Sequence, residues 1–397
     1  MICLHRCSRA LVPVLLALGS VALFSAGLHY MGPNVAAQGA RAIDTPFSAG
    51  YYASPNQRFG VGLAGGQITD YDVGSLHIGW YSDWSTQLVP LQPGGIRYAQ
   101  LVPVKAREYP TNTLHLTETV RANPGSLWVV GNEPEAVYNQ GNRTPQQYAE
   151  IYHNVYTIVK GNDASAWVAI GGVIEPTALR QKWLDRVLNE YESRYGTAMP
   201  VDVWNIHVQI LPEKAGSWGA EIPVGLTETQ GNLFDFSDDN FSANANPVFF
   251  RQLVTQFRQW MKDRGFQNKP LIISEYGVLF PSDYAAGGGR VIGDQGVIDF
   301  MHATFSFLLD TRDPALGYPA DDGCLVQQWL WYSLNGHPFD DATGRGFNGA
   351  LFSHLDPARI TPFGTAFRQH IWDLLGYPKV FLPAVMRRAS MGQMGAE

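Results

Sequence analysis

The sequence predicts an α/β protein built as a single (β/α)8 barrel, the TIM-barrel architecture. From about residue 58 onward, short apolar segments alternate with longer amphipathic segments, as strands and helices do in such a barrel. Eight of these apolar segments are present, which is the number of strands that the architecture requires. Of the 397 residues, 45 % are apolar and 16 % are charged, so the chain can fill one large core.

The eight predicted strands are short, continuous apolar runs. Such runs are typical of parallel strands that are covered on both faces, because neither face then needs polar side chains. The predicted strands span residues 59–63, 76–81, 95–102, 127–131, 167–172, 201–208, 270–274 and 325–332.

The helices between the later strands have clear start and stop signals. Thr144, Pro145 and Gln147 predict an N-cap, a proline in the first turn and a capping box, and Gly161 ends the same helix. Apolar residues at helical spacing predict further helices over about 179–196, 246–265, 294–308 and 362–375. Between residues 63 and 127 the helical signals are weak.

The N-terminal segment has the pattern of an export signal. Arg6 and Arg9 precede an uncharged apolar run over residues 10–28, and small residues follow up to Ala40. This pattern predicts a cleaved signal peptide, although the run is long enough for an uncleaved membrane anchor. We therefore expect a secreted or cell-envelope protein that meets a membrane only if this segment is uncleaved. The predicted divisions are 1–40 (signal peptide or anchor), 41–58 (linker), 59–376 (catalytic barrel) and 377–397 (C-terminal extension).

Composition and motifs exclude several classes of function. A net charge of -7 and the lack of a basic run argue against a nucleic-acid partner. Cys3, Cys7 and Cys324 provide neither a disulfide framework nor the ligand spacing of a zinc site. Motifs for phosphate cradles, serine nucleophile elbows and zinc proteases are also missing. We expect no cofactor, no metal site and a monomer.

Two glutamates follow predicted strands directly. Glu133 comes after the fourth strand, and Glu275 ends the seventh. In a barrel the chemistry lies at the carboxyl ends of the strands, so both side chains are expected at one mouth. Taken singly, Glu133 could cap a helix start and Glu275 could be a salt-bridge partner. Their joint position favours a paired-carboxylate site.

The residues around both glutamates resemble a known group of enzymes. Gly-Asn-Glu-Pro at 131–134 resembles the Asn-Glu-Pro signature of clan A glycoside hydrolases, whose acid/base glutamate ends the fourth strand. Ser-Glu-Tyr-Gly at 274–277 resembles the segment of that clan's nucleophile at the seventh strand. The resemblance covers about residues 59–376 and implies a retaining hydrolase of β-linked, less often α-L-linked, sugars. Shorter segments at 79–84, 101–103 and 201–207 resemble the glycosyl-hydrolase catalytic-core family, which includes endo-β-1,3-glucanases.

Glycoside hydrolysis gives these residues distinct roles. One carboxyl group donates a proton to the leaving oxygen, and the other attacks the sugar or activates water. Glu133 is the expected general acid and later base, and Glu275 is the expected nucleophile. The resemblance implies that Asn132 bonds the sugar 2-hydroxyl. A carboxyl separation of about 5–5.5 Å would fit retention, and about 6.5–9.5 Å would fit inversion.

The sixth strand brings two further candidates to one face. His207 and Gln209 are two residues apart, and side chains alternate along a strand. Many clan A members have a tyrosine at the position of Gln209, where it orients the nucleophile. Tyr276 or Tyr332 are the alternatives for that role here. His207 could instead be a satisfied histidine at a strand end.

Aromatic residues make up 12 % of the chain, and some are expected at the site. Trp80 and Trp84 lie near the end of the second strand, and Trp329 and Trp331 share one face of the eighth. We expect at least two of these four to be exposed in one cleft, stacked on sugar rings, with core packing as the alternative. The aperiodic segment 211–246, which contains Trp218, is expected either to wall the cleft or to be a solvated insertion.

The sequence thus predicts a secreted retaining glycoside hydrolase that acts on a β-linked polysaccharide or oligosaccharide. Two alternatives remain open. A non-catalytic carbohydrate-binding protein of the cell envelope could use a degenerate barrel, and a transglycosylase could use the same residues.

Overall fold

The structure is a computed structural model that describes residues 46–105, 112–137, 140–217, 219–231, 241–280, 283, 291–338, 340 and 346–377. The chain divides into two units, Met1–Ile43 and Asp44–Glu397, and the account below concerns the second. The predicted signal peptide or anchor (1–40) and nearly all of the predicted C-terminal extension lie outside the described residues. None of the described helices has the length and apolar character needed to cross a membrane.

Each of the eight predicted strand segments overlaps a strand, and the third overlaps two. The strands are β1 (Phe59–Gly62), β2 (Trp80–Ser82), β3 (Arg97–Tyr98), β4 (Gln100–Val102), β5 (Leu127–Asn132), β6 (Trp167–Gly172), β7 (Trp204–Val208), β8 (Leu271–Tyr276) and β9 (Gln328–Trp331). All pairings between these strands are parallel. The prediction of an α/β fold with parallel strands is therefore confirmed.

The strands form two sheets, with the orders β3-β2-β1-β9-β8-β7 and β4-β5-β6. Ala99 alone separates β3 from β4. On the other side, the isolated parallel bridges Ala169↔Val203 and Val173↔Ile206 link β6 to the chain at β7. The carboxyl ends of all nine strands therefore lie at the same edge.

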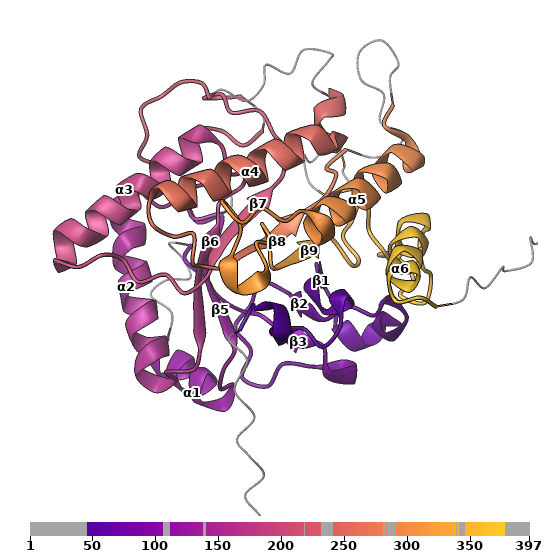
Figure 1. The fold of residues 1–397 in the computed structure, drawn as a ribbon, viewed down its shortest axis with the longest axis horizontal. Coiled ribbons are helices and arrows are strands. Elements are labelled where there is room, and N and C mark those ends of the chain that lie inside the picture. The colour runs from indigo at the N-terminus through magenta and orange to yellow at the C-terminus, as the bar shows by residue number, and fades with distance from the viewer. Residues whose placement is uncertain are drawn as a thin grey trace, which may run out of the picture. The chain divides into compact units, whose positions relative to one another are not determined.

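Six α helices pack outside the strands among the described residues (Figure 1). They are α1 (Thr113–Ala122), α2 (Pro145–Asn162), α3 (Ala178–Tyr195), α4 (Pro247–Asp263), α5 (Gly293–Asp310) and α6 (Pro362–Leu374). The capping box at the start of α2 is present as predicted, since Thr144 and Gln147 each accept the other's backbone N–H. Only short 3-10 turns connect β1 to β3, which agrees with the weak helical signals there.

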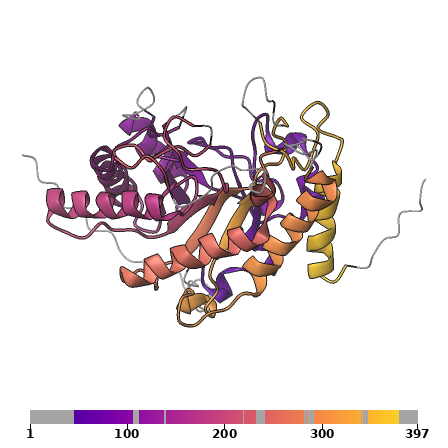
Figure 2. The ribbon, with the colours of Figure 1, turned by 90° about the horizontal axis from the view of Figure 1, so that it is seen from above.

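Both faces of the strands are buried. A small cluster of buried residues includes Trp80, Leu101, Val129, Ile272 and Leu330. A larger cluster, the outer core, contains residues of both the strands and the helices, and Figure 2 shows α4 and α5 lying along the strands. Each face of the strands is apolar because it packs against a core. Polar side chains near the carboxyl ends of the strands are therefore exceptions to the apolar pattern.

Candidate active site

Glu133 is held at the edge of the sheet by an unusual backbone turn directly after β5. Gly131 has φ = 91°, and a Cβ there would lie 2.6 Å from Cγ2 of Val104, so glycine fits this position. Glu133 itself has φ = 41°, and its backbone N–H donates a 3.0 Å hydrogen bond to the Gly172 carbonyl. The turn directs a carboxyl group that is only 6 % exposed toward the carboxyl ends of the neighbouring strands.

Glu275 reaches the same place because the pairing of β7 with β8 is irregular. The register shifts between Ile206 and His207, so that His207 pairs with Glu275. Such a bulge re-aims side chains that would otherwise alternate. As a result Ser274 and Glu275, although consecutive, both contact side chains of β7 and the residue after it.

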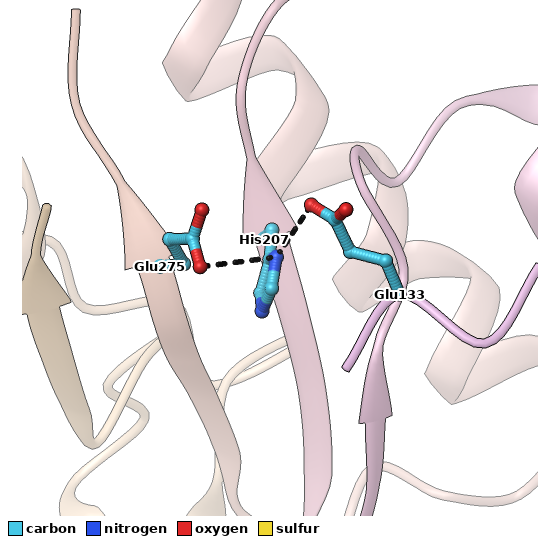
Figure 3. A group of neighbouring side chains, drawn as sticks. All are labelled: Glu133, His207 and Glu275. Carbon is cyan, nitrogen blue, oxygen red and sulfur yellow. Dashed lines mark hydrogen bonds and ion pairs between the residues drawn. The ribbon is translucent and has the colours of Figure 1, made fainter. Parts of the chain in front are cut away.

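His207 lies between the two carboxyl groups (Figure 3). Its Nδ1 is 3.0 Å from Oε1 of Glu133 and 4.0 Å from Oε2 of Glu275. Its Nε2 is 3.0 Å from Oγ of Ser274, a partner that the sequence analysis missed. Gly172 makes room for the imidazole, since a Cβ there would lie 2.6 Å from Nε2 of His207. The ring is 1 % exposed, so all its polar contacts are made within the protein.

Gln209 is the direct partner of Glu275. Its Nε2 donates a 2.7 Å hydrogen bond to Oε1 of Glu275, and its own Oε1 is buried without a partner in the described part of the chain. The glutamine thus makes the contact for which the sequence analysis considered Tyr276 or Tyr332. Tyr276 instead points into the outer core, where its hydroxyl contacts Thr304.

The electrostatics of this group raise the pKa values of both Glu275 and His207. Burial raises the pKa of Glu275 to about 7, and the Glu133 carboxylate adds to the rise, while His207 and Trp84 oppose it. Burial alone would lower the pKa of His207, but Glu275 and the hydrogen-bonded Glu133 together raise it above its usual value. Ionisable groups with shifted pKa values are typical of sites that transfer protons.

The two glutamates face a cavity of about 590 Å³. Glu133, Glu275, Asn132 and Gln209 line it together. The segment 211–221 forms part of the wall, as one of the two expectations for this loop proposed, through Leu211, Ser217, Gly219, Ala220 and Glu221. Trp218 lies outside the described residues.

The expectation that at least two of the four tryptophans are exposed in the cleft is wrong. Trp80, Trp329 and Trp331 are 2 %, 0 % and 0 % exposed. Trp329 and Trp331 share a face, as predicted, but it is the face toward the outer core, where they contact Phe59 and Phe305. Alternation shows which residues share a face, and both faces of these strands are apolar, so the sequence did not show which face met the helices.

Trp84 is the predicted tryptophan that lines the cavity. It is half-buried, and its ring meets that of Tyr332 at 5.4 Å between centroids. A Cβ on Gly62 would lie 2.5 Å from the Trp84 ring, so this glycine makes room for the indole. Tyr332 and Phe347 complete an aromatic side of the cavity.

Asn132 also lines the cavity. Its Nδ2 donates a 3.0 Å hydrogen bond to Oε1 of Gln140, while its Oδ1 is buried and finds no partner among the described residues. Gln140 had no signal in the sequence, because it lies in the loop after Glu133 and outside any predicted element.

A second buried group of charges lies behind the cavity wall. Arg180 contacts Glu135 and Glu213, and its Nη2 donates to the carbonyls of Ala220 and Glu221 at 2.6 and 3.1 Å. The side chains of Arg180, Glu135 and Glu213 are fully buried. Arg180 therefore joins the loop that follows Glu133 to the segment that walls the cavity.

Glu133, His207 and Glu275 could also hold a metal ion. Within the described part of the chain, one ligand atom from each lies within 4.8 Å of the others. Two carboxylates and one imidazole suit several divalent cations. His207 and Glu133 already form a hydrogen bond with each other, and a cation held through Nδ1 of His207 would have to replace it.

Comparison with known proteins finds similarity in structure and not in sequence. No family model and no curated protein matches the chain. A glucosidase from Croceicoccus marinus is similar with a TM-score of 0.51 and 13 % identity, over 80 % of this chain and 68 % of that one. An endo-β-1,3-glucanase from Amycolatopsis mediterranei, solved with laminaritriose, gives 0.48 and 16 % over 79 % and 99 %. An oligosaccharide-binding protein from Trichoderma gamsii gives 0.45 and 10 % over 83 % and 97 %. At such identities the similarity to the glucosidase concerns the fold.

Proposed function

We propose that the protein is a retaining glycoside hydrolase that cleaves β-linked polysaccharides or oligosaccharides. The observation that carries the proposal is the pair Glu133 and Glu275. Both face one cavity, and an oxygen of one lies within 4.8 Å of an oxygen of the other. This spacing favours the short carboxyl separation of retaining enzymes over the longer one of inverting enzymes.

In the proposed mechanism, Glu275 attacks the anomeric carbon while Glu133 donates its proton to the glycosidic oxygen. The bond between the anomeric carbon and that oxygen breaks, and a glycosyl ester on Glu275 forms. Glu133, now ionised, takes a proton from water, whose oxygen attacks the anomeric carbon and releases Glu275. Both steps invert the anomeric centre, so the product retains the original configuration.

The other residues of the cavity have supporting roles in this proposal. Gln209 holds Glu275 and stabilises its ionised form through the 2.7 Å hydrogen bond. His207 holds Glu133 through Nδ1. The unpaired Oδ1 of Asn132 is an acceptor that suits a sugar hydroxyl. Trp84, Tyr332 and Phe347 offer faces on which a sugar ring can stack.

We also propose that the strands close into one (β/α)8 barrel. The bridges between β6 and β7 and the single residue between β3 and β4 support closure. An experimental structure with an open gap between β6 and β7 would contradict it. The export of the protein, directed by residues 1–40, is part of the same proposal, and N-terminal sequencing of secreted material tests it.

Azide rescue is the decisive experiment. Hydrolysis of a panel of β-linked glycans should fall by about 10² to 10⁴-fold in Glu133→Gln, and at least as far in Glu275→Gln. Azide should restore turnover of activated aryl glycosides by Glu275→Gly and yield the α-glycosyl azide. With Glu133→Ala it should yield the β-glycosyl azide instead, because the glycosyl ester on Glu275 still forms.

Two controls accompany this experiment. Glu221→Gln changes a third glutamate of the cavity. Its rate of the chemical step, and its products in the presence of azide, should match those of the wild type. Chelation with EDTA should leave the rate unchanged if no metal takes part. Undiminished hydrolysis in both Glu133→Gln and Glu275→Gln would exclude the mechanism.

Carbohydrate binding without turnover is the second candidate function. The raised pKa of Glu275 favours it, because a carboxyl group that titrates at about 7 is partly protonated at neutral pH and is then a poor nucleophile. Saturable glycan binding with no product from pH 5 to pH 9 would support this candidate. A transglycosylase would instead form longer products at high acceptor concentration.

A further inference from the structure

A second pocket lies at the opposite edge of the sheets. It has a volume of about 210 Å³, and its lining includes Trp80, Arg97, Leu127 and Gln328. These four are the first residues of β2, β3, β5 and β9. Since the strands are parallel, the pocket lies at their amino ends, whereas Glu133 and Glu275 lie at the carboxyl ends.

Arg97 brings an unused positive charge to this pocket. Its Nη2 is buried and has no hydrogen-bond partner among the residues that the structure describes. Its Cζ lies 4.4 Å from the ring centroid of Tyr51 and 5.8 Å from that of Tyr52, so both rings support the guanidinium while its Nη2 is left to bind a ligand. None of the described residues that line the pocket is acidic.

The neighbouring Arg58 differs from Arg97 in having an acidic partner. Arg58 also lies over the Tyr52 ring, at 4.3 Å, but it forms a two-pronged ion pair with Asp321. Arg97 has the same kind of aromatic support without the carboxylate. A buried donor without a partner costs free energy, which a bound anion can recover.

The remaining walls fit a small ligand with an apolar part. Phe47, Tyr51 and Trp80 provide aromatic surface. Gln328 uses its Oε1 to accept a hydrogen bond from the Tyr52 hydroxyl, so its Nε2 is left as a second donor. The volume is well below that of typical drug-sized sites, about 300–1,000 Å³, so the ligand is small.

We propose that this pocket binds a small organic carboxylate, with the carboxylate paired to the edge of Arg97 and the apolar part against the aromatic wall. The site is separate from the proposed catalytic cavity, and its occupant is recognised by charge.

Binding of benzoate at constant ionic strength, followed by ligand-observed NMR and calorimetry on the full chain, tests the proposal. Benzoate should bind saturably, and benzamide, which has the same shape without the charge, should bind at least tenfold more weakly. Arg97→Gln should weaken benzoate binding at least tenfold. Gln328→Glu, which places a negative charge on the wall with little change in shape, should weaken it as well.

Arg368→Gln is the matched control. Arg368 also stacks on an aromatic ring, with its Cζ 5.2 Å from the Trp372 centroid, but it does not line the pocket. This variant should bind benzoate as the wild type does. The proposal is overturned if benzoate does not saturate the wild type, or if folded Arg97→Gln and Gln328→Glu both bind it undiminished. The readout is binding, so it does not depend on whether the protein hydrolyses glycans.

Discussion

The Nε2 atom of Gln209 donates a 2.7 Å hydrogen bond to Oε1 of Glu275, from the residue directly after β7 to the penultimate residue of β8. Both side chains are buried, so water does not compete for this contact. A donor that binds the ionised form of a carboxyl group lowers its pKa. The hydrogen bond from Gln209 is therefore expected to favour the ionised, reactive form of Glu275.

Replacing Gln209 with leucine should raise the pKa of Glu275 above that of the wild type. We expect the acidic limb of the kcat/KM profile to move to higher pH and kcat/KM at pH 6 to fall by about tenfold, since one pKa unit corresponds to a tenfold change. Gln140→Leu removes a glutamine that contacts Asn132 and should leave the limb where it is. If the acidic limb of the kcat/KM profile of Gln209→Leu lies at the same pH as in the wild type, the hydrogen bond has no part in the ionisation of Glu275.

The wild-type pH profile should itself report Glu275. A nucleophile with a pKa of about 7 is ionised above that pH and protonated below it, so kcat/KM should fall as the pH drops through about 7. An uncharged oligosaccharide substrate keeps the titration on the enzyme. An acidic limb near the ordinary glutamate pKa would instead indicate that substrate-free Glu275 is already ionised in weak acid.

Gly172→Ala should displace His207. The added Cβ would lie 2.6 Å from Nε2, too close for any real contact, so the imidazole must move away from Ser274 and Glu133. We expect kcat to fall by about tenfold or more, because small displacements in an active site are costly. Gly161→Ala, near the end of α2 with nothing within 4 Å of its Cβ, should leave kcat unchanged.

Trp84 and Trp329 should respond differently to replacement by alanine. Trp329 is fully buried against Phe59, at 4.8 Å between ring centroids, so its loss should cost about 3–5 kcal/mol of unfolding free energy. Trp84 lines the cavity, so its loss should mainly raise KM. Denaturant unfolding and steady-state kinetics on both variants separate the two effects. A KM effect of Trp329→Ala as large as that of Trp84→Ala would contradict the assignment.

Glu175 should make the protein less stable as the pH rises. It is fully buried, its Oε2 accepts a 2.7 Å hydrogen bond from the Leu211 N–H, and burial raises its pKa well above the usual value, with Glu213 adding to the rise. The folded state therefore holds a proton that the unfolded state releases near its ordinary pKa. The stabilisation that Glu175 provides is complete below about pH 4.5, near the ordinary pKa of a glutamate. It is lost as the pH rises toward the pKa of Glu175 in the folded state.

Glu175→Gln carries no such proton and keeps an oxygen for Leu211. We therefore expect a higher Tm than the wild type at pH 8 and a difference that shrinks toward pH 4.5. Thermal unfolding across this range measures it. A variant that is less stable than the wild type at pH 8 would show that the Glu175 carboxylate is favourably bound there by Arg180.

Much of the fold could be predicted from local pattern. Each of the eight apolar segments overlaps a strand, and the capping box of α2 forms at Thr144 and Gln147. The weak signals between residues 63 and 127 correspond, in the described part of that range, to short 3-10 turns and the helix α1. The split of the third strand into β3 and β4 had no signal, because it depends on which neighbours each half pairs with.

The sequence by itself determined which glutamates follow the strands, since Glu133 and Glu275 are placed by the lengths of the apolar runs before them. Only the tertiary structure decided in which direction the side chains near these glutamates point. The register shift at His207 turns Ser274 toward His207 and Glu275 toward Gln209, and Trp329 and Trp331 face the helices rather than the cavity. The physical reason is that both faces of these strands are buried, so the apolar pattern that marks a strand does not distinguish its two sides.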